Sequence, residues 1–139
     1  MELVIGTINM RRKLIAGNWK MNTNINSANE LVSSIIEKIE GREPKSELLV
    51  CPPFTNLSSV NELIKDKNIS LGAQNCEYRD SGAYTGEVSV EMLISVGCKY
   101  VIIGHSERRQ YYGDTDEIIN LKIKQVLKHN LTPIFCIGE

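Results

Sequence analysis

The chain has 139 residues, of which 42% are hydrophobic and 24% charged, and its formal net charge is −1. This is the composition of an ordinary globular domain, and the charge balance gives no support for binding to nucleic acid or to an anionic membrane surface. No segment approaches the run of about 18 apolar residues that a membrane span needs. We therefore expect a soluble domain that binds neither nucleic acid nor membrane.

The cysteines and the first residues indicate the cellular compartment of the protein. Four cysteines lie far apart and form no C-x-x-C pair, so we expect neither a zinc site nor a redox motif, and no other metal site. Three of them lie in apolar strand or helix-end contexts, so we expect buried, reduced thiols, as in a cytoplasmic protein. The basic cluster Arg11–Lys13 follows the mildly apolar start, which is the reverse of a secretory signal. We expect residues 1–10 to be an extension outside the fold and residues 11–139 to form one domain.

Short apolar runs and helical segments alternate along the chain. The runs lack clear alternation of apolar and polar residues, which predicts strands buried on both faces, at 14–17, 48–51, 69–73, 100–104 and 132–137. Apolar residues at helical spacing predict four intervening helices, which start near Ser27, Asn56, Ser89 and Asp114. Ser27 with Glu30 predicts a capping box at the start of the first helix, and Gly41 predicts its left-handed end. Asp114 with Glu117 predicts the start of the last helix, and Asn130 predicts its left-handed end.

This β-α-β-α-β-α-β-α-β order predicts an α/β fold with a parallel sheet and right-handed crossovers. The connection 74–88 is much longer than usual, and long loops on a rigid scaffold often bind a partner. An open, doubly wound sheet is the alternative architecture. It would require a glycine-rich first turn, which Gly17-Asn18-Trp19 does not supply.

Polar residues follow the first and fourth predicted strands. Asn18 and Lys20 follow the first, and His105 follows the fourth, so the carboxyl ends of parallel strands would bring them together. A loop lysine is usually a solvated surface group, and a lone histidine is more often structural than catalytic. Trp19 would anchor the loop, and an amide beside a cation suits an anionic substrate. Glu107 would hold Lys20 or simply complement the helix dipole.

A helix is expected to begin at Ser106, which would be its N-cap, and its dipole favours a neutral His105. The segment 104–108 also resembles the start of a serine-hydrolase elbow, but Arg108 replaces the second glycine. The later histidine that a hydrolase needs would be His129, whose position favours a role at a helix C-terminus. No glycine-rich nucleotide loop is present, so no nucleotide cofactor is expected.

Taken together, these motifs resemble the triosephosphate isomerase family. The resemblance rests on four segments in the family's order: Gly17-Asn18-Trp19-Lys20-Met21-Asn22, Gly72-Ala73-Gln74-Asn75 with Gly82–Ser89, Ile103-Gly104-His105-Ser106-Glu107-Arg108-Arg109, and Pro133–Glu139. It implies a (β/α)8 barrel and the interconversion of dihydroxyacetone phosphate and glyceraldehyde 3-phosphate through an enediolate, without metal or cofactor.

The resemblance also implies roles for individual residues. Asn18 and Lys20 would contact a small phosphorylated three-carbon substrate, Lys20 would supply positive charge, and His105 would be the neutral electrophile. Ser106 and Glu107 would support these groups. The loop 74–88 would insert into a second copy of the chain, with Gln74 and Thr85 as contacts in a cytoplasmic homodimer of glycolysis and gluconeogenesis.

A complete barrel takes about 250 residues. The resemblance therefore implies an incomplete (β/α)8 barrel ending after its fifth strand, without the glutamate that acts as general base, the lid loop or the last phosphate-binding loops. We expect this chain alone to be inactive, and to be loosely folded, aggregated or dependent on a partner, because its edge strands would be uncovered. The alternative function is a non-catalytic half-barrel that binds or assembles through the loop 74–88.

Overall fold

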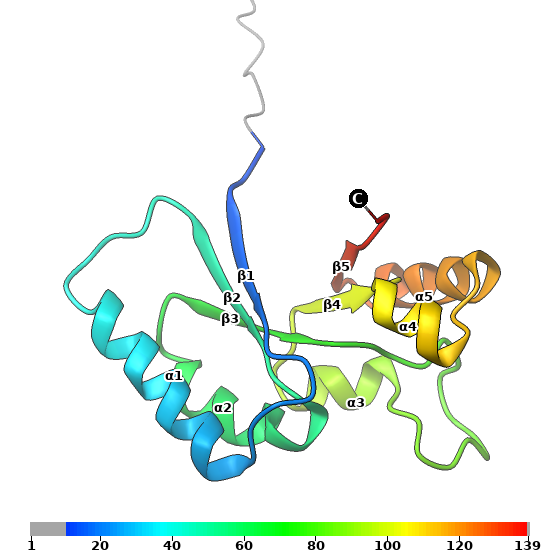
Figure 1. Cartoon of the computed structure of the whole chain (residues 1–139), viewed down its shortest axis with the longest axis horizontal. Helices are drawn as coiled ribbons and strands as arrows, with labels where there is room; N and C mark the ends of the chain where they lie inside the picture. Colours follow the sequence, from blue (N-terminus) through cyan, green and yellow to red (C-terminus); the bar gives the residue numbers. More distant parts are fainter. Residues whose placement is uncertain (1–10, 139) are drawn as a thin grey trace, which may run out of the picture.

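The computed structural model of the chain describes residues 11–138, so the expectation for residues 1–10 lies outside the described part. Strands and helices alternate along the chain as predicted, and both helices expected after the fourth strand, from Ser106 and from near Asp114, lie between the last two strands (Figure 1). The elements are β1 (Leu14–Asn18), α1 (Ile25–Ile39), β2 (Glu47–Cys51), the 3-10 turn η1 (Phe54–Asn56), α2 (Leu57–Ile64), β3 (Ile69–Ala73), α3 (Val90–Ser95), β4 (Tyr100–Ile103), α4 (Ser106–Tyr112), α5 (Asp116–Lys128) and β5 (Thr132–Phe135).

The five strands form one curled parallel sheet in the order β1-β2-β3-β4-β5. The helices lie along the outer side of this curve (Figure 1), so the fold is a half-barrel and not the alternative doubly wound sheet, which carries helices on both faces. A large apolar cluster fills the space between sheet and helices, and a smaller one lines the inner face, with Leu49, Cys51, Tyr100 and Ile102 buried in it.

The starts of α1 and α5 differ from the sequence prediction. Helix α1 is capped by Asn24, whose side chain accepts a hydrogen bond from the Ser27 N–H while the Ser27 hydroxyl accepts one from the Asn24 N–H. The capping box therefore begins three residues before Ser27, because asparagine caps a helix as well as serine does. Helix α5 is capped by Thr115 and not by Asp114, which is buried in ion pairs. The left-handed conformations predicted at Gly41 and Asn130 are confirmed.

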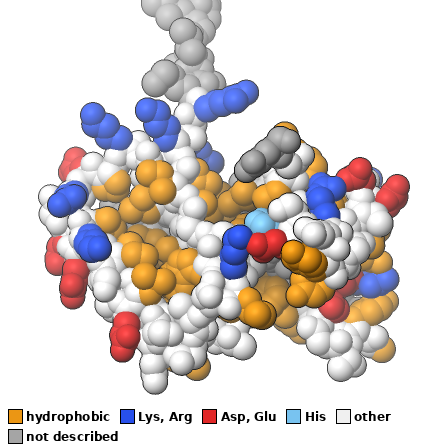
Figure 2. All heavy atoms as spheres, viewed as in Figure 1, with side chains coloured by type: hydrophobic (Ala, Val, Ile, Leu, Met, Phe, Trp, Pro, Cys, Tyr) orange, Lys and Arg blue, Asp and Glu red, His pale blue; other side chains and the backbone are white. Residues whose placement is uncertain are grey.

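The outer strands are less buried than the sequence pattern predicted. Strands β2, β3 and β4 are largely buried, whereas β1 is exposed along most of its length and β5 along part of it. Ile15 is 60% exposed and Phe135 is 49% exposed. Hydrophobic side chains reach the surface beside β1 and over α1 (Figure 2). Among residues 11–138, each of these two strands has a pairing partner on one side only.

These uncovered edges predict that the 139-residue chain self-associates as its concentration rises. Ile15→Lys combined with Phe135→Lys places a charge on each edge and is expected to weaken association by at least about tenfold, since each lost apolar contact contributes roughly 1.5 kcal/mol. Sedimentation velocity over a concentration series measures this.

Ile94→Lys serves as the matched control, because Ile94 is 42% exposed on α3, away from both edges. We expect this control to leave association unchanged. A monodisperse monomer that unfolds cooperatively at all concentrations would contradict the prediction.

Candidate functional site

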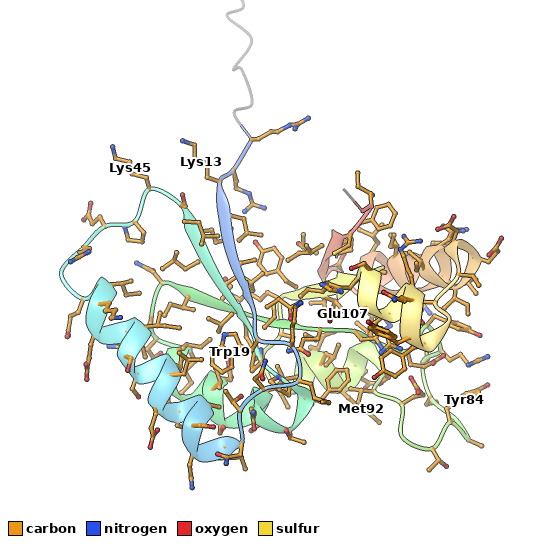
Figure 3. All side chains as sticks on the ribbon, viewed as in Figure 1. Lys13, Trp19, Lys45, Tyr84, Met92 and Glu107 are labelled. Atoms are coloured by element: carbon orange, nitrogen blue, oxygen red, sulfur yellow. The ribbon has the colours of Figure 1, made fainter. Side chains whose placement is uncertain are left out.

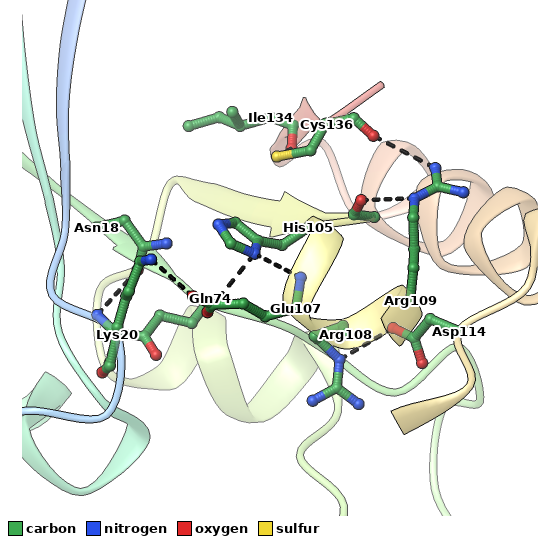
Figure 4. A network of polar contacts seen from close by, with 11 residues as sticks. Asn18, Lys20, Gln74, His105, Glu107, Arg108, Arg109, Asp114, Ile134 and Cys136 are labelled. Carbon is green, nitrogen blue, oxygen red and sulfur yellow. Dashed lines mark hydrogen bonds and ion pairs between the residues drawn. The ribbon is translucent and has the colours of Figure 1, made fainter. Parts of the chain in front are cut away.

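The candidate site lies at the edge of the sheet where the parallel strands end. Lys20 follows β1, Gln74 follows β3 and His105 follows β4, so the topology brings together residues far apart in sequence (Figure 4). In Figure 3, Trp19 lies in the loop after β1 and Glu107 at the start of α4. Trp19 is partly buried against the main apolar cluster, which confirms its predicted role as the anchor of this loop.

The ammonium of Lys20 is held by the carboxylate of Glu107. The Lys20 Nζ to Glu107 Oε1 distance is 2.6 Å, although the two residues are 87 positions apart. The hydrogen bond from Lys20 lowers the pKa of Glu107 below its ordinary value. Glu107 also stands in the first turn of α4, where its charge complements the helix dipole. The two interpretations of Glu107 from the sequence therefore both hold.

His105, and not Ser106, is the N-cap of α4. Its Nδ1 accepts a hydrogen bond of 3.1 Å from the Glu107 N–H. A ring nitrogen that accepts this bond carries no proton, so the imidazole is the tautomer with its hydrogen on Nε2. His105 can therefore offer an Nε2–H donor to a bound molecule. Ser106 is an exposed residue in the first turn, so the helix cap lies one residue earlier than the sequence predicted.

The loop that carries Lys20 has a constrained backbone. Lys20 adopts a φ of +54°, which non-glycine residues rarely do, and such strain often marks functional positions. Its N–H donates to Asn18 Oδ1 at 3.0 Å. The Asn18 side chain thus retains its Nδ2 donors for a ligand.

Gln74 secures the same loop from β3. Its Nε2 donates to the Lys20 carbonyl at 2.9 Å and to the Cys51 carbonyl at 2.8 Å. Sequence reasoning singled out Gln74 only as a contact with a second subunit, which stays a prediction. The position of Gln74 directly after a buried strand was the signal that it faces the site.

A buried ion-pair network holds α4 and α5 together behind the site. Lys122 Nζ and Arg108 Nε each lie 2.9 Å from Asp114 Oδ2, and Lys122 also donates to Asn75 Oδ1 at 3.0 Å. Burial by itself would raise the pKa of Asp114, but the hydrogen bonds from Lys122 and Arg108 hold it below its ordinary value. Sequence reasoning missed this network because Asp114 also fits the pattern of a helix start.

The long loop after β3 is fixed to the C-terminal end of α5 and is packed at its tip. Asp80 accepts hydrogen bonds from Gln125 at 2.6 Å and from Lys128 at 3.1 Å, and its Oδ1 lies 3.2 Å from His129 Nε2. The bonds from Gln125, His129 and Lys128 lower the pKa of Asp80 to about 2. His129 is the C-cap of α5, as its sequence position indicated.

Arg79 lies 4.2 Å from the ring centres of both Tyr78 and Tyr84, so the tip of the loop is packed as well. Tyr84 marks this tip in Figure 3. Thr85, the other predicted subunit contact, follows Tyr84 and is exposed. Its role stays a prediction.

An ammonium, an amide and an imidazole N–H are all hydrogen-bond donors, and together they suit a small anion on which negative charge develops.

Within residues 11–138, no group of three or more His, Cys, Asp or Glu side chains is arranged to hold a metal ion. None of the helices in that range is both long enough and apolar enough to cross a bilayer. Cys51, Cys76 and Cys98 are free thiols whose pKa is raised to about 12 by burial, which agrees with the buried, reduced state expected for most of the cysteines.

Comparison with known proteins places these features in a family. The family model described as triosephosphate isomerase matches residues 13–139. Over 130 residues, or 94% of this chain, the sequence is 50% identical to triosephosphate isomerase of Chlorobium phaeobacteroides (strain BS1) and 51% identical to that of Thermoanaerobacter sp. (strain X514). A crystal structure of triosephosphate isomerase from Bartonella henselae superposes on 92% of the chain with a TM-score of 0.84 and 42% identity.

The chain spans about half the length of the curated relatives it matches, since the aligned region is 52% of each of these two proteins. It likewise covers 52% of the Bartonella henselae chain. The half-barrel therefore corresponds to part of a (β/α)8 barrel, as the sequence predicted. On the match of the family model over residues 13–139, this chain belongs to the triosephosphate isomerase family.

Proposed function

We propose that this chain carries the electrophilic half of an active site that interconverts dihydroxyacetone phosphate and glyceraldehyde 3-phosphate through an enediolate. The observation that carries the proposal is the convergence of Lys20 and His105 on Glu107, with Lys20 Nζ 2.6 Å from the carboxylate and His105 Nδ1 3.1 Å from the backbone nitrogen. Family membership supports the same substrate, and the donor set suits its phosphate and the oxyanion that forms next to it.

Each residue has a distinct role in the proposed reaction. The Lys20 ammonium attracts the phosphate and stabilises the developing oxyanion, and Asn18 donates from Nδ2. His105 stays neutral and donates its Nε2–H to the substrate oxygens; triosephosphate isomerase is itself the standard example of this use of a histidine. Glu107 holds Lys20 in place before substrate arrives, and Ser106 contributes to the helix start. By the family resemblance the general base is a glutamate outside residues 1–139.

The proposal extends to the setting of the enzyme. The loop 74–88 would dock on a second copy of the chain, with Gln74 and Thr85 at the contact, and the homodimer would act in glycolysis and gluconeogenesis in the cytoplasm. The internal bonds of Asp80 and Arg79 support this role for the loop, because a preformed loop loses little conformational freedom on docking. No cofactor is required.

The exposed edges of β1 and β5 favour a second candidate, a non-catalytic half-barrel that acts as a binding or assembly module. The two candidates differ in one measurable property. The enzyme needs the missing base to be supplied, whereas the module needs only its exposed edges and the loop 74–88.

The deciding experiment compares two proteins in a coupled isomerase assay. One is the 139-residue chain alone, and the other, termed here the completed chain, is residues 11–139 joined through Glu139 to the part of the Thermoanaerobacter relative that follows the matched region. We expect the chain alone to turn over at least about 10²- to 10⁴-fold more slowly, the usual contribution of a general base. A folded but inactive completed chain would favour the module. Activity of the chain alone close to that of the completed chain would contradict the assigned roles.

A further inference from the structure

Asn56 has a buried side-chain amide that does not cap its own helix. It is 0% exposed and occupies the N-cap position of α2, where an asparagine side chain ordinarily accepts a hydrogen bond from the first turn. The Asn56 side chain makes no such capping bond. Instead its Nδ2 donates to the Thr23 carbonyl and to the Thr23 hydroxyl oxygen, each at 3.0 Å. The amide thus serves a loop 33 positions earlier in the sequence.

The residue that Asn56 contacts has an unfavourable backbone conformation. Thr23 has a φ of +78°, and a β-branched residue rarely adopts this left-handed conformation. Such a conformation persists only where the surroundings restrain it. The two hydrogen bonds from Asn56 engage both oxygen atoms of Thr23, so they restrain its backbone and its side chain together.

Thr23 lies in the same short loop as Lys20. Gln74 fixes the first half of this loop through the Lys20 carbonyl, and Asn56 fixes the second half through Thr23. Lys20 itself has a left-handed φ of +54°. Between these two attachments, the backbone direction that sends the Lys20 side chain toward Glu107 is determined from both sides.

We propose that Asn56 is a positioning residue for Lys20, acting through Thr23. The inference rests on the proposed function of Lys20, but it concerns only where that ammonium is held. Asn56 touches no bound molecule in this scheme, because its amide is occupied by Thr23. Releasing the Thr23 end would let the loop relax and would weaken the contact between Lys20 and Glu107.

The test measures how fast Lys20 is acetylated, because acylation requires a lysine that has left its ion pair. The 139-residue chain at low micromolar concentration is treated with the N-hydroxysuccinimide ester of acetic acid, and the yield at each lysine is read by peptide mass spectrometry. Lys65 is the internal reference. Its side chain is 49% exposed and 2.7 Å from Glu62, whereas that of Lys20 is 52% exposed and 2.6 Å from Glu107. The ratio of the two rates cancels any general loosening of the fold.

Asn56→Leu, which keeps the branched shape of the side chain and removes the donors, is expected to raise the Lys20 to Lys65 ratio by about twofold to fivefold, the range set by an exposed ion pair. Glu107→Gln gives the ratio for a Lys20 that has lost its ion pair. In an Asn56→Leu chain that circular dichroism shows to be folded, an unchanged ratio, including one in which both lysines react faster, would overturn the proposal. The readout needs no isomerase activity, so it fails or succeeds independently of the coupled assay.

Thr23→Val is the second variant, for the case in which Asn56→Leu unfolds the chain and the two lysines become equally reactive. It removes one of the two acceptors on a partly exposed residue and keeps the side-chain shape. We expect a smaller rise of the ratio in the same direction. A wild-type ratio in folded Thr23→Val would also overturn the proposal.

Discussion

Replacing Lys20 by methionine is expected to lower kcat/KM of the completed chain by about 10²- to 10³-fold, the usual cost of removing one preorganised donor from a developing oxyanion. Methionine keeps most of the length of the side chain and removes only the charge and its hydrogen bonds. The loss should fall largely on kcat, because the oxyanion exists only in the transition state. Steady-state kinetics in the coupled assay, with both triose phosphates, measure the two parameters separately.

Lys65→Met is the matched control for this variant. Lys65 has nearly the same side-chain exposure as Lys20 and also pairs with a carboxylate, but it lies at the end of α2 away from the site. We expect it to leave kcat and KM unchanged. If Lys20→Met lost less than about tenfold, the role of Lys20 in stabilising the oxyanion would be wrong.

The second large effect concerns stability. Lys122→Met is expected to lower the free energy of unfolding of the completed chain by about 3 kcal/mol, because it leaves the buried Asp114 carboxylate with Arg108 as its remaining cation. Urea unfolding at one fixed protein concentration, followed by circular dichroism, measures the change. The exposed ion pair removed by Lys65→Met should contribute less than about 1 kcal/mol.

Two further comparisons identify the unpaired charge as the cause. Adding Asp114→Leu to Lys122→Met should recover part of the lost stability, because the double variant buries no carboxylate. The loss of stability caused by Lys122→Met should also be smaller at acidic pH. The hydrogen bonds from Lys122 and Arg108 hold the pKa of folded Asp114 below its ordinary value despite burial, so this stabilisation is present above the unfolded pKa and is lost as pH falls through the folded one. A double variant less stable than Lys122→Met would contradict this explanation.

Local sequence signals predicted the elements well but some of their ends poorly. Apolar runs placed all five strands, and helical spacing placed the helices between them. Asn24 and Ser27 are both good caps, as are Asp114 and Thr115, so the pattern alone could not choose between neighbours. In the second case tertiary structure made the choice, because Lys122 and Arg108 supply charges that Asp114 pairs with only after α4 and α5 have packed.

The candidate site also has features that the sequence determined and features that only the tertiary structure decided. The sequence determined that Asn18, Lys20 and His105 stand at strand ends, because buried parallel strands are recognisable from runs of apolar residues. The carboxyl ends of such strands share one edge of the sheet. Only the tertiary structure decided what each side chain touches. Lys20 pairs with Glu107, and the Asn56 side chain donates to Thr23 and not to its own helix. A polar side chain bonds to the partner that the packed neighbouring elements present, and those elements come from distant parts of the chain.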